Sequence, residues 1–131
     1  MDVFKTVAGT IGKEVPNNIA KDGVNLLPFI SSKQNLEIPH KTLFWRIDYV
    51  KYVRKSNWKL HINTKEGFTR LHYLKNDPIE KKDLSKVYPE KVKELKLELA
   101  NWEKNLKKPS WLNIVDAKVE DGLGNRYFFP W

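Results

Sequence analysis

The stretch WKLHI at residues 58–62 decides the fold of this chain, because apolar and polar residues alternate along it. Such alternation is typical of a β-strand that buries one face, here the face of its first, third and fifth side chains. Residues 49–54 and 68–74 show strand patterns on either side, and polar breaks of hairpin length separate the three segments. The second break ends in Gly67, a residue that tolerates positive φ. The sequence therefore predicts a series of short antiparallel strands.

A further strand is predicted ahead of these three, beginning at His40 and reaching Arg46. Its alternation places Leu43 and Trp45 on one face and Phe44 with Arg46 on the other. A small antiparallel sheet of this kind buries one face only, so it needs a cover. We therefore expect an α+β fold with a small antiparallel sheet of about four strands.

One long helical pattern follows the strands, and Pro89 at its first position is a favourable start. Apolar side chains then recur at spacings of three and four, as in a helix with one apolar stripe. These side chains are Val92, Leu95, Leu99, Trp102 and Leu106. We expect helix 89–107 to lay this stripe on the sheet and Pro109 to end it. The alternative is a helix that binds a partner, but the neighbouring sheet favours the core.

Shorter patterns lie outside the sheet and its helix. Residues 2–12 carry apolar side chains at helical spacing and predict a leading helix. An Asp-Gly turn at residues 22–23 leads into residues 26–30, which we expect to form a buried apolar anchor for a linker. Residues 114–119 and 126–131 predict two more strands, which we expect to pair as a hairpin at a sheet edge.

The composition allows one folded domain and excludes several classes of protein. The chain has 131 residues, of which 40% are hydrophobic, and no apolar run reaches the roughly 18 residues of a membrane span. It contains no cysteine, so disulfides and thiolate metal sites are impossible. The net charge of +8 is spread along the chain, and many lysines alternate with glutamates. A nucleic-acid surface would be more clustered, so we expect neither nucleic acid nor a membrane as a partner.

A tryptophan-centred strand is followed by an Asp-Pro-x-Glu loop in the middle of the chain. The residues concerned are Val53-Arg54-Lys55, Trp58-Lys59-Leu60, Leu74, Asp77-Pro78, Glu80 and Asp83-Leu84. In this order and spacing they resemble the C-terminal region of the sulfatase family. There a short antiparallel sheet follows the large catalytic α/β domain, and a turn around an Asp-Pro pair leads into a late helix.

The resemblance covers most of the chain and implies two parts. Residues 1–38 would be the end of a catalytic domain and its linker, because their Asp-x-Phe-x-Thr and Asp-Gly-x-x-Leu-Leu-Pro segments are similar to those of sulfatases. Residues 39–131 would be the C-terminal subdomain, with its sheet and helix 89–107. The resemblance thus implies a fragment whose partner is the missing sulfatase catalytic domain.

Hydrolysis of a sulfate ester needs a nucleophile, a cation and an acid for the leaving group. In the sulfatase family the nucleophile is a formylglycine made from the first residue of a Cys/Ser-x-Pro-x-Arg motif, which this chain lacks. The family's calcium ligands and catalytic residues would lie in the missing domain. We therefore expect the chain to be inactive alone and to hold no cofactor, while the parent would carry calcium and formylglycine. Sulfatases are commonly exported, which leaves the compartment of this chain open.

Two residues are candidates for contact with a sulfated glycan or aryl sulfate. In the sulfatase fold, the strand that begins near His40 leads into the sheet from near the catalytic cleft. The guanidinium of Arg46 could bind sulfate oxygens through two hydrogen bonds. Read without the resemblance, Arg46 is a surface charge and His40 a loop histidine. The other histidines, His61 and His72, have no metal-ligand spacing, so no metal site is predicted.

A free-standing basic module that binds a polyanion, such as a sulfated glycan, is the alternative function. The two hypotheses differ in what they demand of residues 2–12 and 26–30. A complete small domain should bury the apolar side chains of these segments, whereas a fragment should leave them exposed.

Overall fold

The computed structural model describes the backbone of residues 2–16, 22–31, 38–107, 116–120 and 126–130. Side chains are described for these residues except 116 and 126–130. The chain divides into two compact units, Met1–Lys41 (unit 1) and Thr42–Trp131 (unit 2). Within the described ranges, no helix is long and apolar enough to cross a membrane.

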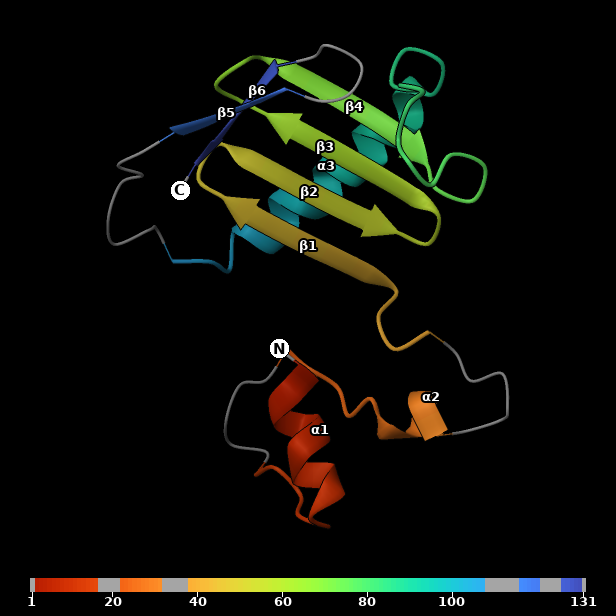
Figure 1. The fold of residues 1–131 in the computed structure, drawn as a ribbon, viewed down its shortest axis with the longest axis vertical. Coiled ribbons are helices and arrows are strands. Elements are labelled where there is room, and N and C mark those ends of the chain that lie inside the picture. The colour runs from red at the N-terminus through yellow and green to blue at the C-terminus, as the bar shows by residue number, and fades with distance from the viewer. Residues whose placement is uncertain (1, 17–21, 32–37, 108–115, 121–125, 131) are drawn as a thin grey trace. The chain divides into compact units, whose positions relative to one another are not determined.

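Unit 2 contains the antiparallel sheet that the sequence predicts (Figure 1). Consecutive strands are neighbours in it, and each pairs in an antiparallel manner with the next. The strands are β1 (Thr42–Ile47), β2 (Val50–Lys55), β3 (Trp58–Asn63) and β4 (Phe68–Tyr73). This confirms the α+β class and the sheet of four strands.

Two of the connections in the sheet are tight two-residue turns. Ile47 pairs with Val50, and Lys55 pairs with Trp58. Such short hairpin loops match the strand twist only when the backbone adopts positive φ. Asp48 and Ser56 accordingly have φ of 48° and 52°. The longer third turn ends at Gly67 with φ 71°, as its glycine predicts.

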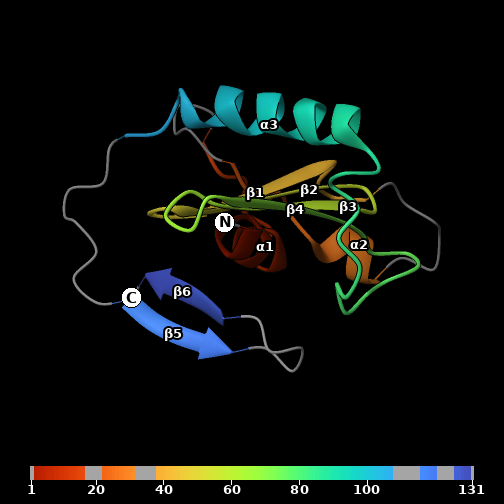
Figure 2. The ribbon, with the colours of Figure 1, turned by 90° about the horizontal axis from the view of Figure 1, so that it is seen from above.

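Helix α3 (Pro89–Glu103) covers one face of the sheet (Figure 2). Its Leu95 and Leu99 pack on Val53 of β2, Leu60 of β3 and Leu71 of β4, and all five are buried. Larger side chains pack around this centre: Phe44, Trp58, Ile62, Leu84, Val92 and Trp102. Full burial of a leucine or valine side chain contributes about 1.5–3 kcal/mol relative to exposure. This apolar contact holds α3 on the β1–β4 sheet.

The helix ends earlier than the apolar spacing predicts, at Glu103 instead of residue 107. Beyond it the backbone hydrogen bonds tighten, with Asn105 N–H donating to Trp102 and Leu106 N–H donating to Glu103. Such i-to-i−3 bonds are typical of a frayed last turn. Leu106 leaves the stripe and is 37% exposed. The predicted stop at Pro109 lies outside the described residues.

The segment between β4 and α3 is fastened by two aspartates. The Asp77 carboxylate accepts backbone N–H bonds from Lys81 (3.1 Å) and Lys82 (2.8 Å). The Asp83 Oδ1 atom accepts the N–H of Leu71 at 3.0 Å, which ties the segment to β4. Leu84 continues this tie through its N–H bond to the Leu71 carbonyl at 2.7 Å. Asp77 therefore holds the loop together, while Asp83 and Leu84 attach it to β4.

In unit 1, which extends to Lys41, the described helices are α1 (Asp2–Thr10) and α2 (Leu27–Ser31), and the segment 22–26 leads into α2. The N–H of Leu26 donates to Thr6 Oγ1 at 3.0 Å and so joins the segment to α1. A Cβ on Gly9 would lie 2.4 Å from the Asn25 side-chain amide, so a larger residue there would require Asn25 to move. The predicted leading helix is therefore present.

The apolar side chains of unit 1 are largely exposed. On α1, Val3 is 73% exposed and Phe4 is 61% exposed. The predicted anchor at residues 26–30 is not buried as a whole, because Ile30 is 72% exposed. Only its first two residues, Leu26 and Leu27, are half-buried. The helix α2 is too short to cover both its own apolar residues and those of α1.

The two late strands pair with each other, as the sequence predicts. They are β5 (Asp116–Glu120) and β6 (Arg126–Pro130), with Asp116 opposite Pro130. They form a separate two-stranded sheet and do not extend the β1–β4 sheet at its edge.

Candidate functional site

Arg46, the first candidate, lies on the helix-covered face of β1 in unit 2. Its register places it opposite Lys51 of β2. The guanidinium donates from Nη1 to Glu103 Oε1 at 3.4 Å and from Nη2 to the Lys107 carbonyl at 3.3 Å. Both bonds are long, and the side chain keeps 22% of its surface exposed. Arg46 therefore closes the C-terminal end of α3 onto the sheet and keeps further N–H donors.

The lysines on the same face of the sheet also bind glutamates of α3. Lys51 Nζ lies 2.8 Å from Glu103 Oε1, so Glu103 serves two cations. Lys55 Nζ contacts Glu94 at 3.0 Å and also contacts Glu98. These two glutamates raise the pKa of Lys55. Partly exposed ion pairs contribute little stability individually, but they neutralise the cations of this face.

His40, the second candidate, lies in unit 1. Its Nε2 atom is 2.9 Å from both carboxylate oxygens of Asp2. The same carboxylate accepts the N–H of Val24 at 2.9 Å. This backbone bond, followed by the bond from His40, lowers the pKa of Asp2. The Asp2 carboxylate thus fastens the start of α1 to two later parts of unit 1.

The two candidates therefore sit in different units, each with partners from its own unit. The partners were missed in the sequence because they are distant along the chain. Asp2 precedes His40 by 38 residues, and Glu103 follows Arg46 by 57 residues. No local spacing signals such pairs.

The remaining histidines lie on the face of the sheet opposite α3. His61 stacks on Tyr52 with ring centroids 4.4 Å apart and meets Phe68 edge-on at 5.0 Å. Burial, with the nearby positive charge of Arg70 second, lowers the pKa of His61 to about 4. His72 is buried, and its Nδ1 atom lies 3.1 Å from the Lys82 carbonyl. Both histidines therefore contact other residues of the fold.

The side chains do not fit the cofactors that the sulfatase resemblance implies for a whole enzyme. The sequence has neither a cysteine nor a Ser-x-Pro-x-Arg motif from which formylglycine could arise. Across the described ranges, no group of three or more histidine, cysteine or acidic side chains could hold a metal ion. The described residues therefore do not fit a calcium ion, and the sequence does not fit a formylglycine.

A shallow pocket of about 390 Å³ lies beside the exposed Trp45 on the face opposite α3. Its cations are already bound within the protein. Lys59 Nζ contacts Glu80 Oε1 at 2.6 Å, and Arg54 donates to the Ser56 carbonyl at 3.3 Å. This pocket is therefore a weak candidate for an anion site.

No known protein family and no curated protein matches the chain. Several solved structures do match it, and those of sulfatases are among them. Ps i-CgsB has 26% sequence identity and a TM-score of 0.66, over 84% of this chain and 25% of that one. A 2-O glycosaminoglycan sulfatase has 26% identity and a TM-score of 0.60, over 79% of this chain and 24% of that one. A candidate sulfatase from Bacteroides thetaiotaomicron VPI-5482 also has 26% identity and a TM-score of 0.60, over 79% of this chain and 24% of that one.

These matches confirm the resemblance to the sulfatase family. The chain spans about a quarter of the length of each matched protein. It therefore has the fold of one part of a sulfatase, in agreement with the C-terminal region to which its sequence is similar.

Proposed function

We propose that this chain is the C-terminal part of an arylsulfatase-like sulfuric ester hydrolase and is not catalytic alone. The observation that carries this proposal is the unequal coverage. Sulfatase structures match 79–84% of this chain but only about a quarter of their own length. In this proposal residues 1–38 are the end of the catalytic domain and its linker, and residues 39–131 are the C-terminal subdomain.

The exposed apolar face of α1 supports a structural role in the parent enzyme. Unit 1 leaves Val3, Phe4, Val7 and Ile11 more than half exposed. Contiguous exposed apolar residues on a helix are typical of a surface that a further domain covers. In this role the chain closes one side of the substrate cleft and contributes few chemical groups to it.

The groups that it contributes are Arg46 and His40. Arg46 is held at the end of α3 by long hydrogen bonds and retains N–H donors for sulfate oxygens. The substrate class would be a sulfated glycan or an aryl sulfate. Among the matched proteins, one is a 2-O glycosaminoglycan sulfatase and Ps i-CgsB was crystallised with k-i-k-neocarrahexaose.

The alternative, a free-standing basic module for a polyanion, has less support. Lys51, Lys55 and Lys59 each bind a glutamate, so these three lysines of the sheet do not offer a free charge to a polyanion. A salt series on a heparin column separates the hypotheses, because several sulfate contacts would make retention strongly salt-dependent. We expect elution at low salt.

The proposal is tested by sulfate release from an aryl sulfate and from a sulfated disaccharide. We expect no release by the 131-residue chain alone and release by the natural polypeptide that contains it. In that polypeptide, Arg46→Gln and His40→Gln should raise KM more than they lower kcat. Release by the isolated chain, or none by the natural polypeptide, would contradict the proposal.

A further inference from the structure

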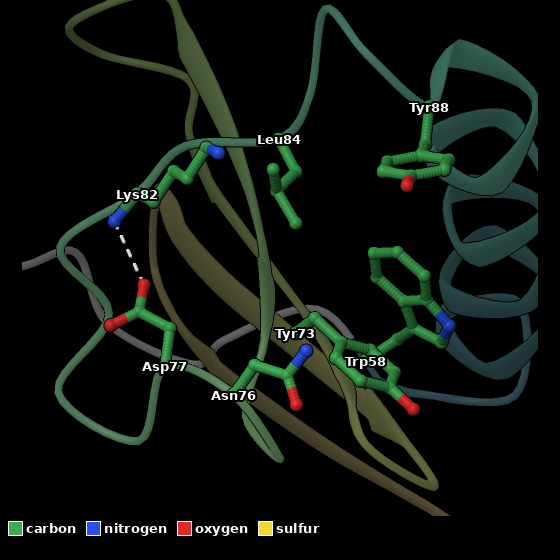
Figure 3. Close-up of a pocket in the computed structure, with 7 residues that line it drawn as sticks. All are labelled: Trp58, Tyr73, Asn76, Asp77, Lys82, Leu84 and Tyr88. Carbon is green, nitrogen blue, oxygen red and sulfur yellow. Dashed lines mark hydrogen bonds between the residues drawn. The ribbon is translucent and has the colours of Figure 1, made fainter.

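A second pocket, of about 510 Å³, lies in unit 2 where β3 and β4 meet the segment leading into α3 (Figure 3). Its walls combine aromatic, amide and charged side chains. They are Trp58, Tyr73, Asn76, Asp77, Lys82, Leu84 and Tyr88. Neither Arg46 nor His40 belongs to it, so it is distinct from the candidates for the sulfatase cleft.

One side of the pocket is aromatic. Trp58 is the centre, with the ring of Tyr73 at 4.8 Å and the ring of Tyr88 edge-on at 5.2 Å. Trp58 also packs against the hydrophobic core, which fixes its ring. Tyr88 is 47% exposed. Figure 3 shows the Trp58 and Tyr88 rings together on the side nearest α3. This wall packs on the core at Trp58 and is partly open to solvent at Tyr88.

The opposite side is polar. The Asp77 carboxylate is occupied by two backbone N–H groups, as Figure 3 shows for the bond from Lys82. The other end of Lys82, its ammonium group, extends toward Leu84 in the same view and away from Asp77. Within the described part of the chain, neither this ammonium group nor the Asn76 amide has a side-chain partner. By contrast, Lys55 is bound to Glu98 of α3, and Lys59 is bound to Glu80.

This combination suits a particular kind of ligand. A sugar ring has a C–H face that packs on an aromatic ring and a rim of hydroxyls that hydrogen-bond to an amide. An anionic substituent on the ring would add a charge-assisted bond to a free ammonium group. Pockets with apolar walls and a few convergent polar groups are typical of small-molecule sites.

We propose that this pocket binds one ring of an anionic saccharide. The ring packs on Trp58 and Tyr88, a hydroxyl contacts the Asn76 amide, and the anionic group lies at the Lys82 ammonium. Sulfate and carboxylate share the oxygen chemistry that this contact requires. The binding is a property of the 131-residue chain by itself and does not depend on assembly with a catalytic domain. It uses a single ammonium group, so, unlike binding of a polyanion by many cations, it depends only weakly on salt and is compatible with elution from heparin at low salt.

The test measures binding of three probes to the full chain by calorimetry. The probes are a heparin-derived tetrasaccharide, the same tetrasaccharide after desulfation, and neutral cellotetraose. The desulfated probe keeps its carboxylates, so it distinguishes sulfate from carboxylate as the anionic group. We expect the neutral probe to bind most weakly, because it lacks a partner for Lys82.

Lys82→Gln and Lys81→Gln form a matched pair, since both lysines are exposed and only Lys82 lines the pocket. Loss of a charge-assisted bond should weaken binding of an anionic probe about tenfold in Lys82→Gln. Lys81→Gln removes the same net charge and should change the affinity less than about twofold. Lys82→Gln should leave the affinity for cellotetraose unchanged.

A second readout locates the ligand. In ¹⁵N NMR spectra, we expect saturable shifts of the Trp58 indole N–H and the Asn76 side-chain amide. Asn76 is exposed, so Asn76→Ala should weaken the binding of all three probes without unfolding the chain. The proposal is overturned by absence of saturable binding at millimolar probe, by equal effects of the two lysine variants, or by shifts that bypass Trp58 and Asn76. None of these outcomes bears on sulfate release by the natural polypeptide.

Discussion

Helices α1 and α3 have similar apolar stripes and opposite surroundings. On α3 the stripe is buried, with Leu95 at 0% and Leu99 at 3% exposure. On α1 the stripe is exposed, with Val3 at 73% and Phe4 at 61%. The sheet next to α3 explains the first case. Unit 1 has no comparable layer among its described residues, which explains the second case.

The two units therefore differ in how they are held together. Unit 2 combines an apolar core, helix–sheet ion pairs and a fastened loop. In unit 1 the Asp2 and Thr6 side chains accept hydrogen bonds from the N–H groups of Val24 and Leu26, and most large apolar residues are exposed. The variants below test this comparison, from the largest expected effect to the smallest.

Leu95→Ala should lower the free energy of unfolding of unit 2 by about 2–5 kcal/mol, because it opens a cavity in the core. Leu97→Ala is the matched control on the same helix, since Leu97 is 63% exposed. It should change the free energy by less than about 0.5 kcal/mol. Urea denaturation followed by circular dichroism measures both. Equal effects would show that α3 does not pack on the sheet by the stripe described.

Asp83→Ala should lower the free energy of unfolding by about 1 kcal/mol through loss of its hydrogen bonds to Leu71 and Ser85. Burial opposes ionisation of Asp83, but these bonds lower its pKa below the ordinary value. Asp83→Asn keeps one carbonyl acceptor and should recover part of the loss. If both substitutions were neutral in urea denaturation, Asp83 would not fasten the loop to β4.

His61 should make unit 2 less stable in mild acid. Its pKa is about 4 in the folded chain and near 6.5 when unfolded, so the unfolded chain binds more protons between these values. Stability should therefore fall as pH drops from about 6.5 to about 4, on the order of 1 kcal/mol by pH 5 for this half-buried ring. His61→Gln should flatten this part of the curve when unfolding is measured at pH 7, 6 and 5. A curve with the wild-type slope would assign the effect to other groups.

Phe4→Ser and Val7→Ser on α1 should change the unfolding of unit 2 least of all, by less than about 0.5 kcal/mol. They should instead reduce binding of an apolar fluorescent dye, because the exposed stripe supplies the dye surface. Leu97→Ser, a single exposed leucine on α3, serves as the control and should reduce the dye signal less. Unchanged dye binding in the α1 variants would mean that this stripe is covered in solution.

Local patterns in the sequence were sufficient for the elements of unit 2. Alternation around Trp58 gave the strand faces, and spacing from Val92 to Trp102 gave the face of α3 that packs on the sheet. The helix end was wrong by four residues, because Leu106 continued the apolar spacing while the backbone changed to i-to-i−3 bonds. Periodicity reports on side chains and does not register such a change in hydrogen bonding.

The site was less predictable, because its partners are distant in sequence. Arg46 and His40 were chosen through the sulfatase resemblance, and their substrate contacts stay predictions. Their bonds to Glu103 and Asp2 had no local signal. The pocket at Tyr88 was also missed. Trp58 was assigned to the core, which is correct, but a ring that packs in the core can also form the wall of a pocket.

The size of the natural gene product tests the central claim most directly. Blotting of the source cells with an antibody against this chain measures it under denaturing conditions. A band several times heavier than 15.5 kDa, of sulfatase size, is the result that our account predicts. A single band at 15.5 kDa would contradict it, because α1 would then need a different cover and the chain would act without a covalently joined catalytic domain.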